Sequence, residues 1–246
     1  MICRLCITKY KNMKTVLQPG IVVVLSWILV QCIAAQPKDI SLINGIVLKS
    51  ETYTDTKENP TAKIEVTSPV LEGDGEPVVI FNRLAGSFTR VKLAEFSPAQ
   101  GVENSFHRTY RLLSNDQRYV SVRFDTTEST GTVHPEHFST SFNFDLKTGK
   151  EIKLASLFKP GSVYLKLISD HCLKALHLTE DDPFQKGALP DAKNFETWNI
   201  TPGGLLITFQ EYQVGAYVDG RPEVTIPYTE LKSVIDLNGP LGRYVK

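Results

Sequence analysis

The sequence predicts an α+β fold in which an antiparallel β-sheet meander carries helices packed on one face. Residues 119–125 and 138–145 alternate apolar and polar side chains at period two, which is typical of half-buried strands. Residues 78–96 instead repeat apolar side chains near helical spacing. Because sequential strands have short or medium connections and the helices stand apart from them, we expect antiparallel pairing.

The N-terminal half begins with two predicted strands, residues 45–54 and 62–67, separated by a turn cluster at residues 57–60. Pro69 is expected to end the second strand. A helix follows over residues 78–96. Its predicted inward-facing residues recur at helical spacing and are Val79, Phe81, Leu84, Phe88, Val91 and Leu93 or Phe96.

The middle of the chain predicts a hairpin of residues 105–113 and 119–125 around a turn at 114–117. Asn and Asp occur in that turn and tolerate the left-handed conformation that it needs. Residues 138–145 supply a third neighbouring strand. The strand at 119–125 has two distinct faces, Tyr119, Ser121 and Arg123 on one and Val120, Val122 and Phe124 on the other.

The C-terminal half predicts a short helical or 3-10 piece at residues 153–158 and a longer helix over 163–178. Ser162 is the expected cap of that helix. Its predicted apolar face consists of Leu165, Ile168, Cys172 and Leu176. The remaining elements are a loop at 179–194, a hairpin of 195–200 and 205–209, an irregular aromatic stretch at 212–220, a strand at 224–227 and helical turns at 229–235.

The N-terminus is typical of an export signal. Basic residues up to Lys14 precede an apolar run at residues 21–30, and small residues follow at Ala34 and Ala35. The apolar stretch from Ile21 to Ala35 spans 15 residues, short of the roughly 20 that cross a bilayer as a helix. We therefore expect a signal peptide over residues 1–35, cleaved before Gln36.

Three other arrangements of the N-terminus stay open. Translation from Met13 would leave a complete signal over residues 13–35. An uncleaved signal would act as an anchor. Lipid attachment at Cys32 is the third, although Val30 and Gln31 are unusual before a lipidated cysteine. Each arrangement places the remaining chain at the periplasmic or extracellular face of a bacterial envelope.

Charge and cysteine content exclude some classes of protein. The chain has 27 basic and 27 acidic side chains, and removing the four basic residues of the first 35 leaves 23 basic against 27 acidic. A mildly acidic chain without a clustered basic face argues against nucleic-acid binding. Cys172 is the one cysteine after residue 35, so we expect no internal disulfide.

The histidines of the chain invite a metal or catalytic interpretation. His134 and His137 lie three residues apart, with Glu136 between them and Asp125 as a further oxygen donor. Pro135 fixes the backbone there and no third histidine or thiolate follows at a ligand-like interval, so we predict hydrogen-bonding histidines and no metal.

No other motif predicts a catalytic group or a cofactor. Cys172 falls on the apolar helix face and is expected in the core, away from its neighbour His171. The chain contains no Gly-x-Ser-x-Gly elbow. The segment with Glu211, Tyr212, Tyr217 and Asp219 either lines a surface groove or packs on the sheet, and both options stay open.

A series of motifs follows in order along the chain. They are YVSVRF at 119–124, GTVHP at 131–135, FNFDLKTGK at 142–150, LASLF at 154–158, YL at 164–165, GLLITF at 204–209, YQV at 212–214, AYVDG at 216–220 and VTIPYTEL at 224–231. Together they resemble a known family, the extracytoplasmic domain of RsiV anti-sigma factors, which also accompanies the catalytic domain of PdaC-type peptidoglycan deacetylases. The resemblance covers residues 60–236.

The resemblance implies a domain organisation. Residues 36–59 are expected to form a linker and first strand, and residues 60–236 the RsiV/PdaC-like domain. Within it we place a first half at about 60–115 and a second half at about 116–236, with residues 237–246 as a C-terminal tail.

The resemblance also implies a binding role. In RsiV-like proteins this domain lies outside the membrane, binds lysozyme and controls regulated proteolysis. About 20 residues precede the apolar stretch and no deacetylase domain follows Lys246, so we expect neither sigma-factor control nor deacetylation here. We expect an exported, non-enzymatic envelope protein that binds a lysozyme-like muramidase or peptidoglycan. Its candidate contact residues are His134, Pro135, His137, Tyr212, Tyr217 and Asp219.

Two alternatives remain beside this expectation. One is an accessory or metal-dependent protein that modifies cell-wall polysaccharide through His134 and His137. The other is a structural lipoprotein held by Cys32.

Overall fold

The computed structural model describes residues 39–115 and 118–246. The predicted signal with Cys32, and residues 116–117 of the predicted hairpin turn, lie outside the described residues. Gln36–Lys246 forms one compact unit. Within the described ranges, no helix is both long and apolar enough to cross a membrane.

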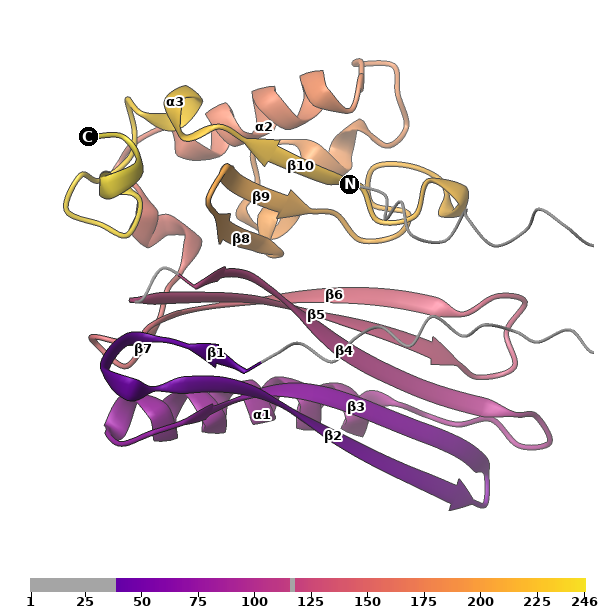
Figure 1. Cartoon of the computed structure of the whole chain (residues 1–246). Coiled ribbons are helices and arrows are strands. Elements are labelled where there is room, and N and C mark those ends of the chain that lie inside the picture. The colour runs from indigo at the N-terminus through magenta and orange to yellow at the C-terminus, as the bar shows by residue number, and fades with distance from the viewer. Residues whose placement is uncertain (1–38, 116–117) are drawn as a thin grey trace, which may run out of the picture. The chain divides into compact units, whose positions relative to one another are not determined.

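Two β-sheets organise this unit (Figure 1). The larger has seven strands in sequence order, namely β1 (Ile40–Ser41), β2 (Val47–Glu58), β3 (Thr61–Glu72), β4 (Asn104–Asn115), β5 (Tyr119–Ser129), β6 (Glu136–Asp145) and β7 (Lys150–Glu151). The smaller has the order β10-β9-β8, formed by β8 (Trp198–Thr201), β9 (Gly204–Thr208) and β10 (Glu223–Ile226). The α-helices are α1 (Glu76–Glu95), α2 (Tyr164–Ala175) and α3 (Tyr228–Leu231).

The expected α+β class with mainly antiparallel pairing is confirmed, and the arrangement differs in two respects. First, β3 and β4 pair in parallel, because α1 connects them as a crossover. Second, helices lie on two sides, since α1 covers one face of the large sheet, the small sheet covers the other, and α2 packs outside the small sheet (Figure 1).

The two faces of strand β5 pack against two different layers of the molecule. Val120, Val122 and Phe124 face the apolar core beneath α1, as the predicted alternation requires. The opposite face is polar and is also buried, because the small sheet covers it. Ser121 Oγ donates to Asn143 of β6 at 2.6 Å and accepts from Asn199 of β8 at 3.0 Å. A hydrogen-bonded layer therefore separates the apolar core beneath α1 from the apolar core around the small sheet.

Arg123 crosses this polar layer. Its side chain is 4% exposed and donates to Thr208 of β9 at 2.8 Å and to Glu223 of β10 at 2.6 Å. Its Nε also lies 3.0 Å from Asp125, so the guanidinium is paired with carboxylates from both sheets. Arg221 binds the same Asp125 at 2.9 Å.

The predicted stripe of α1 is partly wrong. Phe81 is fully buried and its ring lies 5.2 Å from Phe142 and 5.5 Å from Phe144. Val79 and Val91 are 67% and 60% exposed. Because apolar residues occur on more than one side of this helix, spacing alone did not fix which side faces the sheet.

Pro69 does not end its strand as expected but lies within β3, opposite Ser50. The ladder between β3 and β4 stops at Val66, so one edge of β3 is free beyond that point. A proline costs no ladder hydrogen bond on a free edge.

The second core lies around α2 and the small sheet. Ile168 and Cys172 are fully buried there, as predicted. Ser162 does not cap α2, because the N-cap residue is Val163 and the Ser162 hydroxyl is buried without a hydrogen bond. The segment expected to be a C-terminal tail contributes Leu241 and Val245 to this core.

Candidate functional site

Two loops that are distant in sequence meet beside β6. One joins β5 to β6 and carries His134 and Pro135, and the other joins β9 to β10 and carries Tyr212 and Tyr217. The ring of Tyr217 stacks on His134 with centroids 3.7 Å apart, and its hydroxyl donates to the Pro135 carbonyl at 2.9 Å. We call residues 131–138 and 210–219 together the paired-loop surface.

The paired-loop surface contains a cavity of about 360 Å³. The side chains around it combine aromatic, imidazole and carboxylate groups, and they belong to His134, Glu136, His137, Phe138, Gln210, Glu211 and Tyr212. Tyr212 is 56% exposed and its ring lies 5.9 Å from that of Tyr217. Rings of this kind offer large contact areas at low entropic cost.

Gln210 and Glu211 hold the second loop against β6. Strand β6 pairs with β7 only at its last two residues, so most of its outer edge has no strand neighbour. The Gln210 amide accepts from the Ser139 N–H at 3.0 Å and donates to the Ser139 carbonyl at 2.8 Å. Glu211 accepts from the His137 N–H at 3.1 Å. These side chains occupy positions that a neighbouring strand would fill, which fixes the loop in register with β6.

The structure brings five of the six predicted contact residues together, and the sixth lies in the adjacent turn. His134, His137 and Tyr212 line the cavity, and Pro135 and Tyr217 are bonded to each other beside it. Asp219 accepts from the Ala216 N–H at 2.8 Å and so closes the turn that presents Tyr217. Sequence reasoning placed Glu211 beside a possible groove, but it did not single out Glu136, Phe138 or Gln210 as contact residues.

The electrostatics of the site are acidic. Partial desolvation, together with nearby Glu211 and Tyr212, raises the pKa of Tyr217, whose phenol donates to the Pro135 carbonyl. Glu136 and Glu211 are the carboxylates of the cavity wall, and the described residues that line it include no lysine or arginine.

His137 lies between a hydroxyl and a carboxylate. Its Nδ1 is 3.0 Å from Thr127 Oγ1, and its Nε2 is 3.9 Å from Glu211 Oε1. The order hydroxyl, imidazole, carboxylate matches a nucleophile–base pair with an orienting acid. The 3.9 Å separation is beyond hydrogen-bond reach, and the other Glu211 oxygen is already bonded to the His137 backbone.

No three histidine, cysteine or acidic side chains converge as a metal site within residues 39–115 and 118–246. Cys172 lies on the buried face of α2, and burial raises the pKa of its thiol to about 12. Thiolate chemistry at neutral pH is therefore suppressed at this position.

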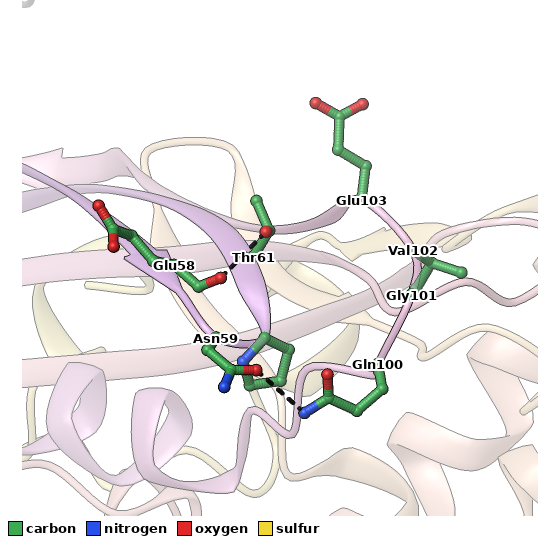
Figure 2. Close-up of a pocket in the computed structure, with 8 residues that line it drawn as sticks. Glu58, Asn59, Thr61, Gln100, Gly101, Val102 and Glu103 are labelled. Carbon is green, nitrogen blue, oxygen red and sulfur yellow. Dashed lines mark hydrogen bonds between the residues drawn. The ribbon is translucent and has the colours of Figure 1, made fainter.

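A second hollow, of about 350 Å³, lies where the tip of the β2–β3 hairpin meets residues 100–103. Figure 2 shows Asn59 and Gln100 facing each other there, linked at 3.4 Å, while the Glu103 carboxylate points away. Glu103 pairs instead with Lys63 at 2.9 Å. The hollow therefore lacks the converging aromatic and ionic groups of the paired-loop surface.

Comparison with known proteins gives a family match for part of the chain. Residues 155–229 match the sequence model of a family described as "Protein of unknown function (DUF3298)". The peptidoglycan-N-acetylmuramic acid deacetylase PdaC of Bacillus subtilis (strain 168) is 26% identical over 137 residues, which cover 54% of this chain and 29% of that enzyme. The chain thus matches less than a third of the length of that relative.

Two crystal structures share the fold. A DUF3298 family member from Bacteroides fragilis NCTC 9343 has a TM-score of 0.62 at 13% identity, covering 82% of this chain and 97% of its own. A DUF3298 family protein from Pseudomonas aeruginosa PAO1 has a TM-score of 0.54 at 15% identity, covering 77% and 94%.

Proposed function

We propose that this chain is an exported, non-enzymatic protein of the bacterial cell envelope that binds a protein partner through the paired-loop surface. The observation that carries the proposal is the stack of Tyr217 on His134, bonded to Pro135 and flanked by two protruding valines. Val133 and Val218 are 102% and 88% exposed. Exposed apolar side chains around rigid aromatic rings are typical of interaction sites.

The charges of the surface indicate the chemistry of the partner. Glu136 and Glu211 border the aromatic residues, and Asp219 lies in the adjacent turn. A partner that fits would be concave, apolar at its centre and basic at its rim, because complementary charges guide and orient association. The RsiV-like motifs favour a lysozyme-like muramidase as this partner.

The geometry favours binding over catalysis. The side chains of Glu211 and Gln210 are hydrogen-bonded to the β6 backbone and hold the β9–β10 loop in place. His137 is therefore left without a carboxylate hydrogen-bonded to its ring. Tyr212 adopts φ 62°, a left-handed conformation that is uncommon for a bulky residue and costs conformational energy. The backbone therefore presents an aromatic ring outward at a conformational cost.

Peptidoglycan is the second candidate ligand, because the relative PdaC is a peptidoglycan-N-acetylmuramic acid deacetylase. Both candidates agree with the export signal predicted over residues 1–35. Both also place the protein at the envelope.

Titration calorimetry with lysozyme tests the proposal. We expect saturable binding that weakens about tenfold or more in Val133→Ser/Val218→Ser, because truncating apolar contacts at an interface centre costs above about 1 kcal/mol. The matched control is Val79→Ser/Val91→Ser, which changes two similarly exposed valines on α1. Tyr217→Ala is expected to weaken binding further.

A flat titration with the unmodified protein would exclude lysozyme as the partner. Co-sedimentation with insoluble peptidoglycan then tests the second candidate with the same variants. Equal weakening in the α1 control would show that the paired-loop surface is not the binding site.

A further inference from the structure

Strand β2 offers a long outer edge to solution. Strand β1 pairs with it only at Val47 and Leu48, and no other described strand lies beyond β2 (Figure 1). Residues 49–58 therefore have no strand partner along one side among the described residues, and residues 51–58 are all exposed. An uncovered edge of this length is a template for pairing with another strand.

The hydrogen-bonding direction of this edge can be assigned. The Leu42 N–H donates to the Ile46 carbonyl at 2.7 Å, so Ile46 points its backbone groups toward the outer side. Alternate residues of a strand point the same way, which directs Ser50, Thr52, Thr54, Thr56 and Glu58 outward. The Thr56 N–H agrees, because it donates to the Asp55 side chain at 2.8 Å.

Antiparallel pairing of this edge with a second copy of itself is limited by that direction. Residues whose backbone groups point outward must lie opposite residues of the other copy whose backbone groups also point outward. The two-fold axis must therefore pass between two copies of the same residue and not between neighbouring residues. With the axis at Thr54, Thr52 faces Thr56, Tyr53 faces Asp55 and Glu51 faces Lys57. Each unlike pair occurs twice by symmetry.

Neighbouring registers are less favourable. An axis at Tyr53 would place Lys49 opposite Lys57 and Glu51 opposite Asp55, pairs of like charge. An axis at Asp55 would place that carboxylate opposite its own copy. Like charges directly opposite each other destabilise a sheet, whereas opposite charges and threonine pairs stabilise it.

We propose that this protein self-associates through β2, forming an antiparallel dimer centred on Thr54, with Glu51 of each copy paired to Lys57 of the other. The charged residues that usually block pairing at a sheet edge are complementary in this register. The Asp55 carboxylate leaves the Thr56 N–H on pairing and faces Tyr53 of the second copy. The inference is independent of the function proposed for the paired-loop surface.

Charge reversal tests the pairing. Sedimentation equilibrium of protein purified after expression of the full chain is expected to show a reversible monomer–dimer equilibrium. Lys57→Glu and Glu51→Lys should each raise the dissociation constant about tenfold, and the double variant Glu51→Lys/Lys57→Glu should restore it. The control Lys63→Glu changes the same charge on the neighbouring strand β3, away from the edge.

A cysteine at the axis tests the register. Thr54→Cys places two thiols at facing positions about 5.5 Å apart between Cα atoms, within disulfide range. Cys172 is buried and does not compete. Oxidation is expected to cross-link Thr54→Cys and to leave the control Thr56→Cys, which faces Thr52, mostly uncrosslinked. A monomer at all concentrations, a dimer insensitive to charge reversal, or equal cross-linking of both variants would overturn the proposal.

Discussion

Asp145, at the end of β6, shows how one residue gives the fold its dependence on pH. Its side chain is 9% exposed, and burial opposes ionisation, but the Arg118 guanidinium and the Lys147 N–H bond the carboxylate at 2.7 to 3.0 Å. The bonds outweigh the burial and lower the pKa of Asp145 below its ordinary value. Because the folded pKa is depressed, the stabilisation is present above the unfolded pKa and is lost as pH falls through the folded pKa.

We therefore expect Asp145→Asn to lower the free energy of unfolding by about 1.5–3 kcal/mol at pH 7, the range for a hydrogen bond to a charged group. The difference from the unmodified protein should shrink as pH falls below about 3.9, the ordinary pKa of aspartate. Urea denaturation at a series of pH values measures this difference in the free energy of unfolding. A difference that stays constant from pH 7 to pH 2.5 would contradict the assignment.

The sequence indicated contact residues of distinctive chemistry. His134, Pro135, His137, Tyr212 and Tyr217 carry rings or fixed backbone geometry in turn-rich segments, and the structure places them together. Gln210 had no local signal, because its role depends on the free edge of a strand some 70 residues earlier. The bond from Glu211 to the His137 backbone depends on the same edge. The carboxylate of Asp219, a predicted contact residue, closes a turn.

At the scale of elements, the polar face of β5 joins the two sheets, and Arg123 is its central contact. Arg123→Ala would leave Asp125 and Glu223 short of a partner in the layer between the sheets. We expect a loss of about 3 kcal/mol in the free energy of unfolding, as for one broken partner of a buried ion pair.

The matched control is Arg111→Ala. Arg111 contacts the same two carboxylates, at 3.5 Å from Asp125 and 2.6 Å from Glu223, but its side chain is 47% exposed. Exposed pairs contribute at most about 1 kcal/mol, so this variant should unfold nearly as the unmodified protein does. Equal losses in both variants, measured by urea denaturation, would mean that the guanidinium of Arg123 does not join the sheets.

Elements were predictable where the local pattern was unambiguous. The alternation of β5, the spacing of α2 and the turn between β8 and β9 all appear in the structure near their expected positions. The facing side of α1 was not determined by spacing, and Pro69 fits inside β3 only because the neighbouring strand ends early. Both outcomes depend on neighbours that the local sequence does not specify.

At the scale of the whole molecule, the layered arrangement of the compact unit could not be derived from the strand patterns. A polar strand face predicts contact with water, whereas here it meets Asn199 and Thr208 of a second sheet. That second sheet has a further consequence, because its β9–β10 loop reaches the edge of β6 and brings Tyr217 onto His134. The paired-loop surface is thus a product of the two-sheet packing.

The most direct test of the central claim is amide hydrogen exchange with and without saturating lysozyme. If the paired-loop surface is the binding surface, protection should rise at residues 131–138 and 210–219 together, and β2 and the exposed side of α1 should be unchanged. Protection confined to one of the two loops, or located at another surface while these segments exchange as in the free protein, would contradict it.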